Sequence, residues 1–319
     1  MKEELIALLE SLLSGFARNE IRIVTGEPDS DLPAGASKFG GIPDCPPDFV
    51  WPYYEGARNV LDKDDDEDVP VSFYDVGWVR EPLTFLAQFD CREASAFDTE
   101  GLLPREGMLS FFYGLNTLRG GFDPRDEGCA RVFWFPPDKP LVPTPPPDDF
   151  VPADITGGMP IPALPLTFES AASLPSYDDF CETKEERDVI SLFPGGQFWK
   201  YFDAAVNRLG WEEDDFGDRH KLLGWPDVIR DAMQFDCEAV TSGYYMGDGS
   251  GMDRMTREEK IAMGEKARSE WILLFEMGTI RAGDFELMWH ICGHIYFWIR
   301  REDLAKRDFS RIWLILQCG

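Results

Sequence analysis

His290 and His294 form the one closely spaced histidine pair in a chain of 319 residues that has three histidines. On a helix, this spacing would bring both rings to one metal ion, as in HExxH zinc sites. Ile291 stands where such a site needs a general-base glutamate. The apolar alternation of residues 295–299 instead predicts a strand with one buried face, on which positions i and i+4 lie about 13 Å apart. We therefore predict no metal site and place both histidines where a strand begins.

Residues 62–68, DKDDDED, resemble the start of a calcium-binding loop because carboxylates occupy alternate positions. Such a loop requires glycine at its sixth position and a bidentate glutamate at its twelfth. Those positions hold Glu67 and Phe73. The run is therefore predicted to be a solvated acidic loop without a bound metal.

Nucleophilic catalysis finds little support in the sequence. Ser250, in the segment GDGSG, lacks the GxSxG register and the preceding strand of a nucleophile elbow. Cys45 and Cys318 have no neighbouring base or helix start that would lower a thiol pKa. Neither a GxGxxG nor a Walker pattern is present. We predict no catalytic residue, no cofactor and no enzymatic activity.

The acidic balance of the chain restricts its partners. There are 59 acidic and 31 basic residues, for a formal net charge of -28. This charge opposes binding to nucleic acid and to anionic membranes, and a basic protein is its natural complement. Alternatively, the charge only keeps a chain with ten Trp and 24 Phe soluble. The candidate partner-binding residues are the two acidic runs: Asp64, Asp65, Asp66, Glu67, Asp68, Glu212, Glu213, Asp214 and Asp215.

Cysteine usage and the N-terminal segment indicate a cytoplasmic protein. The seven cysteines form no CxxC pair and are odd in number, which favours reduced thiols. Residues 2–16 combine acidic residues with leucines at helical spacing rather than the apolar run of a signal peptide. No window reaches the roughly 18 apolar residues that a membrane span needs.

These residues must be positioned by strands, because apolar alternation recurs in both halves of the chain. Eleven of the residues from Pro136 to Pro165 are prolines, which favour an extended connector over a regular ladder. We predict an α+β, mainly β fold of two pseudo-repeated antiparallel β units with peripheral helices, packed as one globule. The predicted parts are an amphipathic helix (1–19), a first β unit (20–135), a Pro-rich connector (136–182) and a second β unit with helices (183–319).

The two halves share a pattern of motifs at an offset near 180 to 187 residues. SKFGGIP at 37–43 corresponds to HKLLGWP at 220–226, and strand, glycine and arginine positions follow in the same order. We infer an internal duplication, because repeat units that cannot bury an apolar face alone pack against each other. Lys38 and Lys221 become equivalent. With Gln88 and Gln317, they are predicted to be buried polar anchors or, alternatively, parts of a pseudo-symmetric ligand site.

SKFGGIP followed by WP, then FLAQ, GMLSFFYG, HKLLGWP, WILLF and the tail YFWIRREDLAKRDFS, together resemble the YwqG-like family, a domain of unknown function designated DUF1963. The resemblance spans roughly residues 20–318. It implies a mainly β fold, no established enzymatic activity and, for members beside secreted bacterial toxins, a proposed immunity role. Relatives tend to have Gly-Asp after the tryptophan at Trp289. Here His290 and Ile291 follow, so any role of that aspartate does not transfer.

Two main hypotheses of function result, beside a third in which the chain is a scaffold that binds an intracellular host protein. The first is a non-enzymatic, cytoplasmic immunity protein that neutralises a basic bacterial toxin, such as a nuclease, through an acidic surface. The alternative is a small-molecule or metal-dependent enzyme with its site between the two repeats. The paired turns at Gly40 and Gly224, with His220 nearby, motivate the alternative.

Overall fold

The computed structural model describes residues 2–61, 73–181, 190, 193, 197–210 and 216–319. Both acidic runs that the sequence singles out, at 64–68 and 212–215, lie outside the described residues. Their predicted role in partner binding therefore stays a prediction.

One large antiparallel sheet organises the described residues. Its strands follow the order β16-β15-β12-β11-β1-β10-β2-β6-β7-β8, and every neighbouring pair is antiparallel. The bounds are β1 (Arg18–Thr25), β2 (Lys38–Phe39), β6 (Thr84–Asp90), β7 (Met108–Tyr113), β8 (Ala130–Phe135), β10 (Leu164–Ser173), β11 (His220–Leu223), β12 (Trp271–Met277), β15 (His294–Arg300) and β16 (Trp313–Gln317). The predicted α+β, mainly β class is confirmed.

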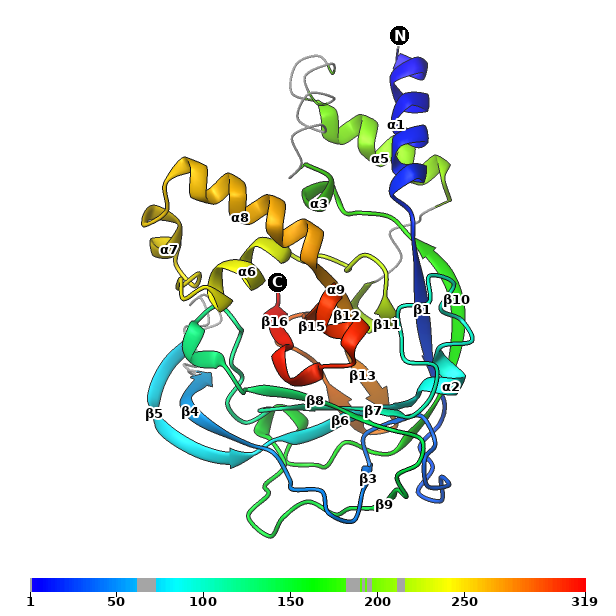
Figure 1. The fold of residues 1–319 in the computed structure, drawn as a ribbon, viewed down its shortest axis with the longest axis vertical. Helices are drawn as coiled ribbons and strands as arrows, with labels where there is room; N and C mark the ends of the chain where they lie inside the picture. The colour runs from blue at the N-terminus through cyan, green and yellow to red at the C-terminus, as the bar shows by residue number, and fades with distance from the viewer. Residues whose placement is uncertain (1, 62–72, 182–189, 191–192, 194–196, 211–215) are drawn as a thin grey trace.

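The strand order is symmetrical about the central pair β1 and β10, which run side by side in Figure 1. On either side follow β11 and β2, then β12 and β6, β15 and β7, and β16 and β8. These are the segments that the sequence matches between the halves. β10 begins within the range predicted as connector and pairs with β2, while β1 pairs with β11. Shared ancestry of the halves remains a prediction.

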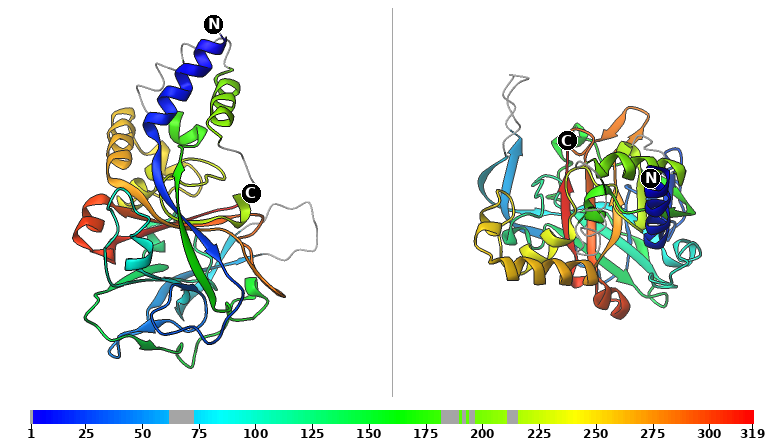
Figure 2. Two further views of the ribbon diagram at one scale, coloured as in Figure 1. Left: turned by 90° about the vertical axis from the view of Figure 1, so that its right-hand side faces the viewer. Right: turned by 90° about the horizontal axis from the view of Figure 1, so that it is seen from above.

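Three two-stranded sheets accompany the main sheet among the described residues, and β4–β5 is the one with long strands, of 9 and 10 residues. The pair β4 and β5 forms an arm that projects from the body (Figure 2). The strands are β3 (Asp44–Cys45) with β9 (Val142–Pro143), β4 (Tyr53–Leu61) with β5 (Phe73–Pro82), and β13 (Ile280–Ala282) with β14 (Phe285–Leu287).

The described α-helices lie at the periphery of the sheet (Figure 1). Thr256 caps α8 through a capping box with Glu259. The helices are α1 (Lys2–Phe16), α2 (Cys91–Ala94), α3 (Tyr177–Cys181), α5 (Phe198–Arg208), α6 (Gln234–Thr241), α7 (Ser250–Asp253), α8 (Arg257–Glu270) and α9 (Arg301–Lys306).

Both faces of β15 are buried, so the prediction of one buried face is wrong. Phe297 and its alternate neighbours pack into the main core, while Tyr296 and Trp298 join a second cluster with Cys237 of α6 and Ala267 of α8. The helices cover the face that alternation alone would assign to solvent. A strand covered on both faces becomes continuously apolar.

The N-terminal helix docks on other helices rather than on the sheet. Leu9 and Leu13 of α1 pack with Phe180 of α3 and with Phe198 and Phe202 of α5, in a hydrophobic cluster separate from the main core. Figure 1 shows this helical group at one end of the molecule. A helix, α1, lies within the predicted segment 1–19 but ends at Phe16, and Arg18 and Asn19 already belong to β1.

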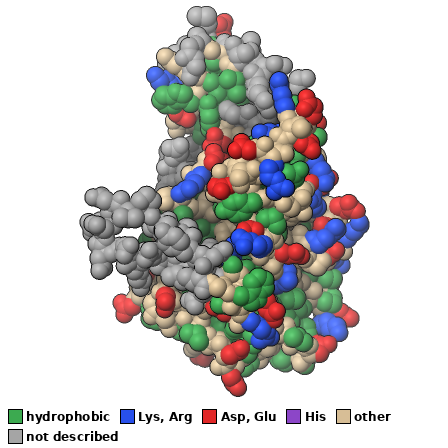
Figure 3. All heavy atoms as spheres, turned by 90° about the vertical axis from the view of Figure 1, so that its left-hand side faces the viewer, with side chains coloured by type: hydrophobic (Ala, Val, Ile, Leu, Met, Phe, Trp, Pro, Cys, Tyr) green, Lys and Arg blue, Asp and Glu red, His purple; other side chains and the backbone are tan. Residues whose placement is uncertain are grey.

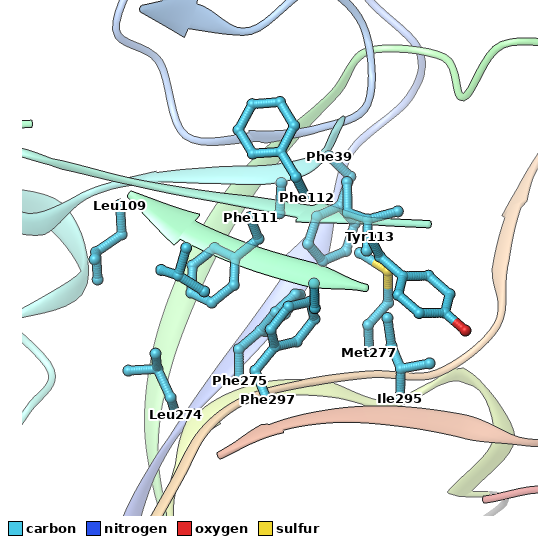
Figure 4. Packing of buried hydrophobic residues seen from close by; sticks show 14 of the residues in the cluster. Phe39, Leu109, Phe111, Phe112, Tyr113, Leu274, Phe275, Met277, Ile295 and Phe297 are labelled. Carbon is cyan, nitrogen blue, oxygen red and sulfur yellow. The ribbon is translucent and has the colours of Figure 1, made fainter. Parts of the chain in front are cut away.

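The main core joins the two halves of the sheet. The Phe275 ring of β12 lies 4.9 Å from that of Phe111 of β7, 5.1 Å from that of Phe89 of β6 and 5.7 Å from that of Phe297 of β15, between centroids. Figure 4 shows Phe111, Phe275 and Phe297 facing one another between the strands. The sheet also curls, because the Leu316 amide of edge strand β16 donates to the Gly120 carbonyl after β7.

Candidate functional site

Lys38 and Lys221 are both buried, and each pairs with an aspartate six residues further along the chain. The Lys38 ammonium lies 2.9 Å from Asp44 Oδ2, and the Lys221 ammonium lies 2.8 Å from Asp227 Oδ1. Lys38 is the first residue of β2, and Lys221 is the second residue of β11, the equivalent strand of the second half. The prediction that these lysines are buried polar anchors is confirmed.

In the first half, Asp44 is the centre of the polar network. Its Oδ2 accepts hydrogen bonds from Lys38 Nζ, from Gln88 Nε2 at 2.7 Å and from the Gly35 amide at 3.1 Å. The Asp44 amide donates to Gln88 Oε1 at 2.8 Å. Asp44 Oδ1 is buried and accepts no hydrogen bond from the described residues. The network therefore contains one unused acceptor beside a buried ammonium.

In the second half, Lys221 is surrounded by carboxylates. Its Nζ lies 3.3 Å from Glu20 Oε2 and 3.7 Å from Glu276 Oε2, in addition to Asp227. Burial disfavours the ammonium, but these carboxylates outweigh burial and raise the pKa of Lys221. Burial also raises the pKa of Glu276, against the opposing effect of Lys221. Glu276 here takes the place that uncharged Gln88 has in the first half.

The histidine pair does not form a joint site. His294 is the first residue of β15 and shares a hydrogen bond of 2.6 Å between its Nδ1 and Glu276 Oε1. His290 precedes the strand in a turn with φ of 55°. His220 Nδ1 accepts from the Gly278 amide, and burial lowers the pKa of His220 to about 3, so this ring is neutral at pH 7. The described residues hold no group of three or more His, Cys, Asp or Glu side chains arranged for a metal.

The other candidate nucleophiles are in unreactive surroundings. Burial raises the pKa of the Cys45 thiol to about 12 and also raises the pKa of the Cys318 thiol, so both are protonated at neutral pH. Ser250 begins the short helix α7, and its amide donates to Asp248 Oδ1. None of these groups is activated for attack by the contacts that the structure shows.

A cavity of about 770 Å³ lies against the first polar network, and Lys38 and Asp44 contribute to its wall. Its volume is in the range of small-molecule sites, which is about 300–1,000 Å³. Large apolar side chains line much of it, including Trp51, Phe85 and Phe150. Trp51 is fixed by the hydrogen bond from its Nε1 to the Leu83 carbonyl.

The proline-rich segment contributes a large part of the lining. Five of its prolines line the cavity: Pro143, Pro146, Pro152, Pro160 and Pro162. The segment is fastened to the first half by the β3–β9 pair, by the hydrogen bond of the Gly41 amide to the Ile161 carbonyl and by that of the Asp29 amide to the Ala163 carbonyl. The stretch predicted as a connector therefore also shapes a binding-sized cavity.

Gly40 permits this close approach. Its φ is 55°, and a Cβ at this position would lie 2.4 Å from the Pro162 carbonyl oxygen and 2.6 Å from that of Ile161. We expect Gly40→Ala to lower the free energy of unfolding by about 2 kcal/mol or more, because strain in φ adds to a backbone clash. The matched control is Gly158→Ala, with φ of 72° but nothing within 4 Å of the added carbon. Urea unfolding should show a clearly smaller loss for the control, and equal losses would contradict the role of the clash.

Asp44, Asp227, Glu20 and Glu276 did not emerge from the motif comparison, although a signal for two of them is present. SKFGGIP and HKLLGWP are each followed directly by aspartate, so the repeated motif extends by one residue to Asp44 and Asp227. Glu20 has no such signal, because it lies 201 residues from Lys221 and meets it only through the pairing of β1 with β11.

The alternative hypothesis places a site between the two repeats. A small cavity of about 10 Å³ lies where Glu100 and Leu102 meet Leu223 and Ile272. This volume is enough for one water molecule. The larger cavity lies against the first half instead. The enzymatic alternative stays a prediction.

Comparison with known proteins gives one finding. A family model described as a domain of unknown function, DUF1963, matches residues 37–318. No curated protein matches the chain. None of the described helices is both long enough and apolar enough to cross a membrane.

Proposed function

The chain belongs to the DUF1963 family, whose function is unknown, and we propose that it is a non-enzymatic, cytoplasmic protein that binds a basic protein partner. The observation that carries this proposal is the formal net charge of -28. The finer proposal is an immunity protein that masks the cationic surface of a bacterial toxin, such as a nuclease. The resemblance to proteins encoded beside secreted toxins supports that assignment.

Side chains of both charges occur together on the surface. Figure 3 shows acidic and basic side chains spread over one face, with hydrophobic side chains between them. A net excess of acidic groups still gives the whole molecule a negative field, which accelerates encounter with a cationic partner. Local contacts must then supply specificity.

Trp78 is the strongest candidate for such a contact. It lies on β5 of the projecting arm, and 74 % of its surface is exposed (Figure 2). Exposed tryptophans are frequent energetic centres of protein interfaces. Nearby, Arg80 pairs with Glu55 at 3.0 Å and lies 3.7 Å above the Tyr53 ring, so the base of the arm carries an ordered set of side chains.

The test uses the purified protein and the product of the adjacent gene in a binding assay at low and at physiological salt. We expect association, with an on-rate that falls by about 10-fold or more as salt rises. Trp78→Ala should weaken binding by about 10-fold or more, whereas Trp199→Ala, a half-exposed tryptophan on α5, should leave it unchanged.

Neutralising the acidic runs separates their role from that of the arm. Replacing Asp64, Asp65 and Asp66 by asparagine should slow association without changing the fold, and the same change at Asp214 and Asp215 provides the comparison. Lack of association at low salt would overturn the proposal, as would binding insensitive to both salt and charge.

A further inference from the structure

We propose that the cavity beside Lys38 and Asp44 is a binding site for an uncharged small molecule that carries one amide-like group on an apolar body. The inference is independent of the proposed protein partner, because it rests on the cavity rather than on the net charge. It differs also from the predicted site between the repeats, since this cavity is lined by the first half and the proline-rich segment.

The polar groups in the wall define the head of the ligand. Asp44 Oδ1 is buried without a hydrogen bond from the described residues, and Lys38 Nζ has Asp44 as its one acceptor there. The Lys38 and Asp44 side chains are 7 % and 1 % exposed, so they must shift slightly toward the cavity to meet the head group of a ligand. Buried polar groups without partners are costly, so the hydrogen bonds gained in this way contribute affinity. An adjacent acceptor and donor match the N–H and C=O of an amide.

Thr84 adds a third polar group. It is buried at the start of β6, lines the cavity, and makes no side-chain hydrogen bond with the described residues. Thr84 lies four residues along β6 from Gln88, which binds Asp44, so its hydroxyl can contact a polar atom on the body of the ligand rather than the amide head. Few polar groups in an otherwise apolar lining are typical of sites that fix the orientation of a ligand.

The charges around the cavity favour a neutral ligand. Lys38 and Asp44 already neutralise each other at 2.9 Å. A carboxylate ligand would gain Lys38 but would be repelled by Asp44 and by Asp29 at the cavity lining. An ammonium ligand would gain Asp44 but would meet the Lys38 ammonium. An amide satisfies both groups without adding a charge.

The apolar body is matched by a rigid lining. Trp51 and Phe85 provide aromatic surface, and the prolines provide restricted backbone. Ile42 and Met159 also line the cavity and are 47 % and 41 % exposed, which places them where a ligand can enter. A preformed lining of this kind reduces the ordering cost of binding.

Three indole probes with different head groups test the proposal: indole-3-propionamide, indole-3-propionate and tryptamine. Titrations of the full chain, followed by calorimetry and ligand-observed NMR, give the three dissociation constants. We expect the amide to bind about 10-fold more tightly than either charged probe, as one hydrogen bond to a charged group would provide.

Variants locate the binding. Met159→Trp and Ile42→Trp should weaken amide binding by about 10-fold or more by filling the cavity. Thr84→Val, which keeps the shape of the side chain, should weaken it by about threefold or more. Val151→Trp is the matched control, because Val151 lies in the same proline-rich segment, is 65 % exposed and does not line the cavity.

The possible results are distinct. Tightest binding of the amide, lost in Met159→Trp and kept in Val151→Trp, would support the proposal. No saturable binding of any probe, equal or tighter binding of a charged probe, or binding unaffected by both cavity-filling variants would each overturn it. Failure to bind the protein partner leaves these titrations unaffected, so the two proposals fail separately.

Discussion

Lys221→Met is expected to lower the free energy of unfolding by about 3–5 kcal/mol, because it leaves Glu20, Asp227 and Glu276 buried without their shared cation. The side chain of Lys221 is 3 % exposed, so water cannot replace it. Urea unfolding followed by tryptophan fluorescence and circular dichroism would measure the loss.

The pH dependence identifies the cause. Burial already raises the pKa of Glu276, and Lys221 opposes that rise. Without Lys221 the pKa of Glu276 in the folded protein rises further, so the folded state holds this proton more tightly. Stability of the variant is then lost as pH rises through the neutral range and partly regained as pH falls toward 5. The difference from the wild type should therefore be larger at pH 8 than at pH 5.

Lys38→Met is the matched control within the same molecule. Asp44 keeps the hydrogen bonds from Gln88 Nε2 and the Gly35 amide to its Oδ2, so one carboxylate with two remaining donors is left behind. We expect a smaller loss than for Lys221→Met and a weaker pH dependence. Equal losses in the two variants, or a Lys221→Met loss that grows on acidification, would contradict this account.

Local patterns predicted most of the main sheet. The strand-like segments PLTFLAQFD at 82–90, GMLSFFYG at 107–114 and CARVFWF at 129–135 correspond to β6, β7 and β8, and the TREE segment at 256–259 has the pattern of the capping box that begins α8. These features depend on neighbours in sequence, so a single chain reveals them. The second buried face of β15 was missed because it depends on α6 and α8, which approach only after folding.

The candidate site was predicted in part. Lys38 and Lys221 stood out because their motif occurs twice, and both proved to be buried anchors. The acceptors of Lys221 come from β1, β12 and the turn after β11, so no local window contains them. The cavity was not predicted either, because a proline-rich stretch indicates extended backbone but not the surface that this backbone covers.

The two halves use the repeated motif differently. In the first half, Lys38 and Asp44 are balanced, the neighbour is uncharged Gln88, and a cavity adjoins the pair. Around the motif of the second half, Glu20 of β1 and Glu276 of β12 both lie close to the Lys221 ammonium, and His294 shares a hydrogen bond with Glu276. A single lysine–aspartate pair beside a cavity can contact a ligand. A lysine–aspartate pair enclosed by additional carboxyl groups can only stabilise the fold. This difference is the physical reason to seek ligand binding in the first half.

Phe275→Ala is expected to lower the free energy of unfolding by about 3–5 kcal/mol, because the cavity it creates lies where the two halves meet. Phe275 is fully buried on β12, and its ring contacts Phe89 and Phe111 of the first half as well as Phe297 of the second. If one core stabilises both halves, fluorescence and circular dichroism should report the same shifted transition.

Trp199→Ala provides the comparison for the same measurement. Trp199 lies on α5 and is half exposed, outside the main core, so its loss should change the free energy of unfolding by no more than about 0.5 kcal/mol. In Phe275→Ala, separate transitions of which one keeps its wild-type midpoint would show that the halves unfold independently. The aromatic contacts between β7 and β12 would then not couple them, and the single shared core inferred from these rings would be wrong.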